Sequence, residues 1–344
     1  MAQNLSRHGG SAPDAGIAAV ERLHQKMMID EEWTARRPRG FTWWGHRLAQ
    51  HVDASELTPG PDGELRSTVT VRTEVVRGVP SAHAGERRQI VNLANKLEAM
   101  SAVVYDEAAG TVEECASAAV GADTVDTWID VLSVASVLQN AAAHSRANAL
   151  AASIGGEPAT SAHPSSGERL QRDDLLNGPV QWASMLGKPV SRFRGEPMLA
   201  LERHASQWSV CTGDETGFTG EVPYSGSRSA IELMVAGQSG HRETALVRMF
   251  TDQPHPQLGS GVLLRMQLPP VFGPDRGVDE AQRLNALEAS GSAPCMLLGA
   301  WCEADGELNY IAFVPSVIAR PGLLENLFVD CAVRSSWAFG ELRT

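Results

Sequence analysis

The sequence carries the same pattern of expected elements twice, and this internal repeat limits the fold more than any other feature. Near the middle of each half, Tyr105–Val112 aligns with Trp301–Leu308, an offset of 196 positions. The aromatic, Glu, Ala, Gly and aliphatic positions of the two segments coincide. The stretches just upstream, Leu93–Ala99 and Leu284–Ala289, are also alike. Such long-range similarity is typical of a duplicated unit, although hairpin turns favour Asp and Gly in any protein.

The first half contains helices at its start, middle and end, with strands between them. Apolar residues at helical spacing predict the helices, and partial alternation in a Val- and Thr-rich stretch predicts a long strand. The expected helices are 14–33, 86–100 and 124–154, and the expected strands are 41–52, 65–79, 102–105 and 111–120.

The second half ends in the same order: long strand, helix, hairpin, helix. Its opening strands match those of the first half less well, and it has an extra hairpin before the long strand. The expected helices are 175–186, 198–208, 279–289 and 322–339, and the expected strands are 217–224, 229–235, 244–250, 261–268, 295–301 and 307–314.

The chain is too long for one typical domain and long enough for two, at 344 residues. Residues 157–167 are rich in Pro, Ser and Ala and lack a hydrophobic period, which predicts a linker. Residues 1–16 are small and polar, which predicts a flexible N-terminal arm. We therefore expect one unit at 17–156 and a second at 168–344.

Together these patterns predict an α+β fold of two tandem units. Each unit is expected to have the order α-β-β-β-α-β-β-α, with helices packed on an antiparallel sheet. A sheet of this size leaves a face or an edge to be covered. Two copies in one chain can cover each other, as subunits do in a two-fold dimer.

The hairpins at 102–120 and 295–314 each lie between a middle helix and a terminal helix. This element order resembles the type III secretion chaperone fold and the YbjN-like proteins that share it. The resemblance rests on element order and acidic character, and it covers about two thirds of each half. It implies a fused pseudo-dimer that binds extended or partly unfolded segments of client proteins and is not an enzyme. Function inferred in this way is analogy at the level of the fold.

The net charge of −12 makes nucleic acid an unfavourable partner, because an acidic surface repels the phosphate backbone. The charge is shared evenly, at −6 in residues 1–164 and −6 in residues 165–344. No stretch approaches the roughly 18 apolar residues of a membrane span, and the N-terminal residues lack the apolar run of a secretory signal. We expect a cytoplasmic protein that does not enter membranes.

The sequence predicts no catalytic residue, no cofactor and no metal site. It has no phosphate-binding loop, dinucleotide fingerprint, GxSxG elbow or HExxH motif. Its five cysteines form no CxxC pair. Acidic neighbours of Cys115 and Cys302 are expected to raise the pKa of both thiols, which argues against a reactive nucleophile.

Four residues are candidates for binding a partner: Trp43, Trp44, Arg37 and Arg39. Adjacent residues on a strand point to opposite faces, so at most one tryptophan is expected in the core of the unit. An exposed tryptophan beside arginines is a typical contact hot spot. The alternative is that the first helix and the second unit cover both rings.

Two classes of function remain open. The first is a protein-binding module, chaperone-like or adaptor, that holds a segment of a client protein and is a monomeric pseudo-dimer or a homodimer. The second is an enzyme or small-ligand-binding protein with a site where the two units meet. A structural component of a larger assembly is a further alternative.

Overall fold

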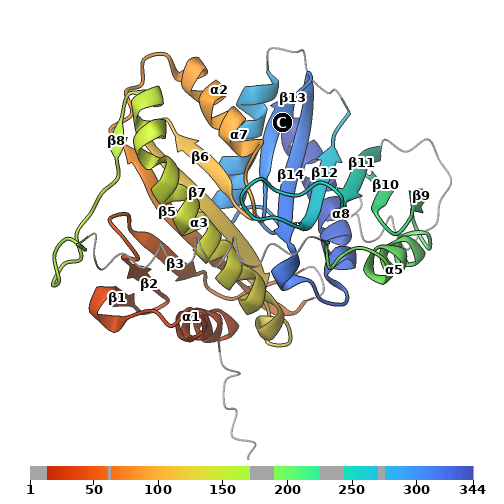
Figure 1. Ribbon diagram of the computed structural model, residues 1–344, viewed down its shortest axis with the longest axis horizontal. Coiled ribbons are helices and arrows are strands. Elements are labelled where there is room, and N and C mark those ends of the chain that lie inside the picture. The colour runs from red at the N-terminus through yellow and green to blue at the C-terminus, as the bar shows by residue number, and fades with distance from the viewer. Residues whose placement is uncertain (1–13, 61–62, 171–189, 225–243, 270–275, 344) are drawn as a thin grey trace, which may run out of the picture.

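The first unit of the computed structural model is an antiparallel sheet with helices packed on it (Figure 1). The structure describes residues 14–60, 63–170, 190–224, 244–269 and 276–343. The helices of the first unit are α1 (Ala15–Lys26), α2 (Ala84–Asn95) and α3 (Val125–Ile154). Its strands are β1 (Thr34–Arg37), β2 (Gly40–Trp43), β3 (Gln50–Ala54), β4 (Thr58–Pro59), β5 (Leu65–Arg77), β6 (Ala102–Asp106), β7 (Thr111–Val120) and β8 (Glu157–Pro158). The main strands lie in the order β1-β2-β3-β5-β7-β6, and β4 and β8 pair with β5.

The second unit repeats this arrangement. Its described helices are α5 (Glu196–Ala205), α7 (Gly277–Ala289) and α8 (Leu323–Leu342), and a short 3-10 helix, η3 (Ser316–Ile318), precedes α8. Its strands are β9 (Cys211–Gly213), β10 (Gly217–Pro223), β11 (Thr244–Phe250), β12 (Gly261–Gln267), β13 (Ala300–Ala304) and β14 (Glu307–Pro315). The sheet order β9-β10-β11-β12-β14-β13 matches that of the first unit strand for strand. The expected α+β class and the two sheet-containing units are therefore confirmed. In the described residues each sheet has four main strands before the middle helix, one more than the order α-β-β-β-α-β-β-α contains.

The opening strands match better than the sequence pattern indicated. Gly40-Phe41-Thr42 begins β2, and Gly217-Phe218-Thr219 begins the corresponding strand β10. The ring of Phe41 is fully buried and that of Phe218 almost so. The two tripeptides occupy the same place in their sheets, so the repeat covers the first strands as well as the hairpins.

The alignment of the two hairpins at an offset of 196 holds for their second strands, β7 and β14. For their first strands, β6 and β13, the correct offset is 198. Asp106 pairs with Thr111 across a four-residue turn, whereas Ala304 pairs with Glu307 across two residues. The shorter turn is Asp305-Gly306, in which both residues have positive φ, as a two-residue hairpin turn requires. The two-residue difference in turn length shifts the first strand, and Val103 rather than Tyr105 corresponds to Trp301.

Several expected boundaries are wrong. Residues 14–16 belong to the start of α1, where the side chain of Asp14 caps the helix, so the arm cannot extend to residue 16. The helix expected to reach residue 33 ends at Lys26. The 157–167 segment is not a free linker, because β8 pairs with β5 and Thr160 bridges to Leu48. The strand expected at 295–301 begins only at residue 300. The expected helix 175–186 and strand 229–235 lie outside the described residues.

The two units meet through their middle helices. In Figure 1, α2 and α7 lie side by side at one end of the molecule. Helix α2 packs on β6 of its own unit and on β13 of the other, and α7 packs on β13 and on β6 in the same reciprocal way. An ion pair between Arg88 Nε and Asp279 Oδ1, 2.8 Å long, links the two helices. Each unit thus covers the edge strand of the other, which a two-fold pair of units is expected to do.

Asparagine side chains fasten these helices to the strands beneath them. Asn95 accepts a hydrogen bond from the backbone N–H of Val103 and donates to its carbonyl, at 2.7 and 2.9 Å. Asn285 makes the same pair of bonds with Trp301, both 2.8 Å. Asn92 makes a third pair across the junction, at 2.8 Å from the N–H of Glu303 and 3.1 Å to its carbonyl. The outer edge of β13 is therefore hydrogen-bonded by one amide from each unit.

Two positions on each middle helix face the edge strands. Asparagine occupies three of these four positions, and glutamine occupies the fourth. Gln282 lies three residues before Asn285, as Asn92 lies three residues before Asn95. The reciprocal packing places α7 on β6, where the counterpart of Glu303 is Tyr105. The side-chain amide of Gln282 is buried, and within the described part of the chain neither of its polar atoms has a hydrogen-bond partner. The extra methylene of glutamine explains why the amide does not occupy the position that asparagine takes at residue 92.

Substituting Gln282→Asn is expected to stabilise the protein. The shorter amide can make the bonds to β6 that Asn92 makes to β13, and satisfying a buried amide contributes about 1 kcal/mol or more. Chemical denaturation monitored by circular dichroism measures the change. Gln89→Asn, on the exposed face of α2, is the control and is expected to change stability by less than about 0.5 kcal/mol. A loss of stability in Gln282→Asn would contradict the reciprocal arrangement.

Candidate functional site

Both tryptophans proposed as partner-binding residues are buried. Trp43 is 6% exposed and Trp44 is 7% exposed. The indole N–H of Trp43 donates to Asp30 Oδ1, and that of Trp44 donates to Ser161 Oγ, both at 3.0 Å. The cover over Trp44 is the segment that follows β8, whose His163 ring packs edge-on against it. The exposed aromatic surface that the hot-spot interpretation requires is therefore not provided by these two rings.

The two arginines proposed beside them bind the chain's own backbone and carboxylates. Arg37 donates to the carbonyl of Phe41 and pairs with Asp53 at 2.8 Å. Arg39 pairs with Asp14 at 2.7 Å and donates to the carbonyl of Ala54. These contacts tie the start of α1 and the first strands together, which gives both arginines a structural role.

The thiols of Cys115 and Cys302 are poor nucleophiles. The main reason is burial, and not the acidic neighbours that the sequence indicated. Burial raises the pKa of Cys302 to about 12 and that of Cys115 further, and the nearby Glu113 adds a smaller effect on Cys115. No group of His, Cys, Asp and Glu suited to hold a metal ion occurs among the described residues. None of the helices in the described residues is long and apolar enough to cross a membrane.

A groove lies where the two units meet, on the opposite side of α3 from its own sheet. Its volume is about 610 Å³. One wall is α3 and the end of α1, and the other wall is η3 and the segment after it. The apolar lining consists of Met27, Val134, Val137, Val317, Ile318 and Ala319. Helix α3 is apolar around most of its circumference, because one face packs on the first sheet and another borders this groove.

Three charged side chains lie at the rim of the junction groove. Asp130 of α3 accepts from Lys26 Nζ at 2.5 Å. Arg320, which comes from the second unit, lies 3.7 Å from the other oxygen of Asp130 and donates to the carbonyl of Thr127 at 2.5 Å. Asp130 thus holds one cation from each unit. These contacts fix the groove walls relative to each other and leave the apolar residues between them.

A second unusual site is a buried cluster of one arginine and two carboxylates in the first unit. Arg146 of α3 pairs with Glu98, and its Nε lies 3.2 Å from Glu114 Oε1. Both carboxylates are at most 2% exposed. Burial raises the pKa of Glu114 well above its usual range, Arg146 opposes this, and Glu98 adds to it. The second unit has a related pair, Arg334 with Glu288 at 3.0 Å. Because these groups lie inside the units, we assign them to stability.

The raised pKa of Glu114 predicts how Glu114→Gln changes stability with pH. A carboxyl whose folded-state pKa exceeds its unfolded value near 4.3 stabilises the protein fully below that pH and loses this contribution as pH rises. The glutamine variant escapes that loss. Relative to the wild type, its free energy of unfolding is expected to rise as the pH increases from 5 to 8.

Urea denaturation of both proteins across this pH range measures the difference. Glu215→Gln, at an exposed position, is the control and should follow the wild type at every pH. A constant difference between Glu114→Gln and the wild type would show that Glu114 titrates normally.

Comparison of the chain with protein-family models, with curated proteins and with solved structures gives no match in any of the three. The candidate site therefore rests on the geometry of this chain alone. Sequence patterns located the helices on either side of the junction groove, but not the groove, because its lining comes from three segments far apart in the chain. The one available signal was that apolar residues of α3 are spread around the helix and not confined to one face.

Proposed function

We propose that this protein is a non-catalytic, cytoplasmic protein-binding module, chaperone-like or adaptor, that holds an apolar segment of a client protein in the junction groove. The observation that carries the proposal is the groove itself, whose aliphatic lining comes from both units. Apolar surface that remains accessible in a folded protein marks sites of interaction.

The groove entrance favours a peptide segment as the occupant. Met27 lines the groove, and the neighbouring Met28 is 86% exposed. Met28 has φ of +50°, in the left-handed region that residues other than glycine seldom adopt. An unusual backbone conformation that holds an apolar side chain in solvent points to a use for that side chain. Methionine adapts its shape to different partners, which suits a surface that binds varied client segments.

The pairing of two alike units supports the same proposal. A tandem duplication explains the shared strand order, and it produces a junction that neither unit has alone. The resemblance of the element order to secretion chaperones and YbjN-like proteins agrees with client binding, although each unit has an additional main strand.

A second candidate function follows from the size of the groove. A volume near 600 Å³ lies in the range of pockets for small ligands, roughly 300–1,000 Å³. A small apolar ligand at the junction is therefore the alternative to a client segment, and the experiment below separates the two.

Val137→Glu is expected to weaken peptide binding by tenfold or more, because it places a charge in the apolar wall of the groove. Short fluorescent peptides of graded aliphatic content are titrated with the full-length protein, and binding is followed by fluorescence polarisation. Affinity should rise with aliphatic content.

Val210→Glu is the matched control, because Val210 is 75% exposed and does not line the groove. It should bind peptides as the wild type does. If an apolar dye enters the groove while no peptide binds, the small-ligand function is correct instead. If Val137→Glu binds peptides unchanged, the groove is not the binding site.

A further inference from the structure

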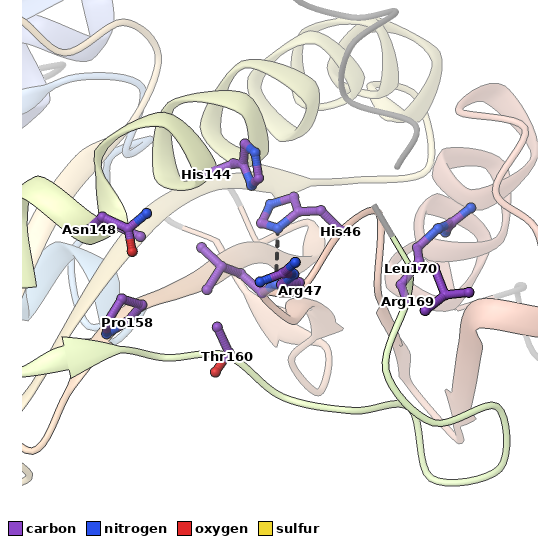
Figure 2. A pocket seen from close by; sticks show the side chains of 10 residues that line it. His46, Arg47, His144, Asn148, Pro158, Thr160, Arg169 and Leu170 are labelled. Carbon is purple, nitrogen blue, oxygen red and sulfur yellow. Dashed lines mark hydrogen bonds between the residues drawn. The ribbon is translucent and has the colours of Figure 1, made fainter. Parts of the chain in front are cut away.

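A second cavity lies at the other end of α3, where the residues just after the expected linker, Arg169 and Leu170, meet the first unit. Its volume is about 230 Å³. Figure 2 shows that its side chains come from three segments: the stretch before β3, one face of α3, and the chain that follows β8. His144 and Asn148 are one turn apart on α3, and the ring of His144 lies beside that of His46. This cavity is separate from the junction groove, whose α3 residues lie between Asp130 and Val137.

The cavity is basic in a protein that is acidic overall. Among the described residues, its lining includes two arginines, Arg47 and Arg169, two histidines and no carboxylate, whereas the chain carries a net charge of −12. The guanidinium of Arg47 is exposed, and no carboxylate in the described residues pairs with it. A local reversal of charge of this kind favours the binding of anions.

Contacts outside the cavity hold the guanidinium of Arg169 in place. The side chain of Arg169 is 4% exposed, pairs with Asp30 at 2.9 Å, donates to the carbonyl of Trp44 at 2.6 Å and lies over the ring of Trp33. These contacts fix one guanidinium at the cavity wall and balance part of its charge.

The imidazole of His46 is also oriented by the backbone. Its Nδ1 accepts a hydrogen bond from the N–H of Leu48 at 3.0 Å, the contact drawn as a dashed line in Figure 2. With Nδ1 as the acceptor, the neutral ring carries its proton on Nε2, so that nitrogen is a donor. The ring centres of His46 and His144 are 4.4 Å apart, which places a second imidazole beside the first.

We propose that this cavity binds a small anion carrying a phosphate or carboxylate group. Arg47 supplies the main charge, because its guanidinium offers paired donors that match both groups. The amide of Asn148 and the hydroxyl of Thr160 supply further donors. The small volume limits the ligand to one compact anionic group with little attached to it. This site is independent of the proposed client-binding function, since none of its lining residues belongs to the junction groove.

Isothermal titration calorimetry with inorganic phosphate, and separately with succinate, tests the proposal on the full-length protein. At least one of the two anions is expected to bind to the wild type with a single site. Arg47→Gln should weaken that binding tenfold or more, and Asn148→Asp, which adds a carboxylate to the wall, should abolish it. Both positions are exposed, so both variants are expected to fold, and their thermal unfolding is measured alongside.

Arg192→Gln and Asn326→Asp are the matched controls, because they make the same changes at exposed positions of the second unit. They should bind as the wild type does. Tighter binding of phosphate than of succinate assigns a phosphoryl ligand, and the reverse order assigns a carboxylate. Absence of binding to both anions, or binding that Arg47→Gln and Asn148→Asp leave unchanged, would overturn the proposal.

Discussion

The molecule depends on the contact between α2 and α7, because this helix pair covers the edge strands of both sheets at once. An uncovered edge strand exposes backbone groups that can pair with another chain. Here the outer edge of β13 is closed by two asparagine side chains, Asn285 from its own unit and Asn92 from the other. A side-chain amide can satisfy both the N–H and the carbonyl of one residue, so a helix closes a strand edge without another strand. The two units are therefore joined by directional hydrogen bonds as well as by apolar contacts, which makes the join specific.

This join fixes where the other features lie. With the middle helices at one end, the terminal helix α3 packs on its sheet and also faces the second unit, and the groove forms between them. The same order of elements produces a buried ion pair in each unit, in which a glutamate at or just beyond the end of the middle helix meets an arginine of the terminal helix, Glu98 with Arg146 and Glu288 with Arg334. Ion pairs buried to this degree are costly to break and favour one arrangement of the helices.

Sequence patterns predicted the helices and strands well, but they predicted less well which segments pack against them. Periodicity located α3, β11 and the hairpin of β6 and β7 within a few residues, because their apolar positions follow the local geometry of helix or strand. The hairpin comparison missed a two-residue difference, because turn length is set by the Asp305-Gly306 turn and not by the flanking strands. Trp43 and Trp44 were predicted to bind a partner and are buried, since a strand pattern gives no information about a covering segment that starts more than a hundred residues later. The basic cavity was missed for the same reason.

Amide hydrogen exchange at the edge strand β13 tests the central claim most directly. The backbone N–H groups of Trp301 and Glu303 both bind asparagine side chains, so both should exchange slowly, like those of the interior strand β14. In Asn92→Ala the amide of Glu303 is expected to exchange much faster, while that of Trp301 stays protected by Asn285. Fast exchange at both amides in the wild type would contradict the account, because β13 would then be an open edge and the two units would not be joined as described.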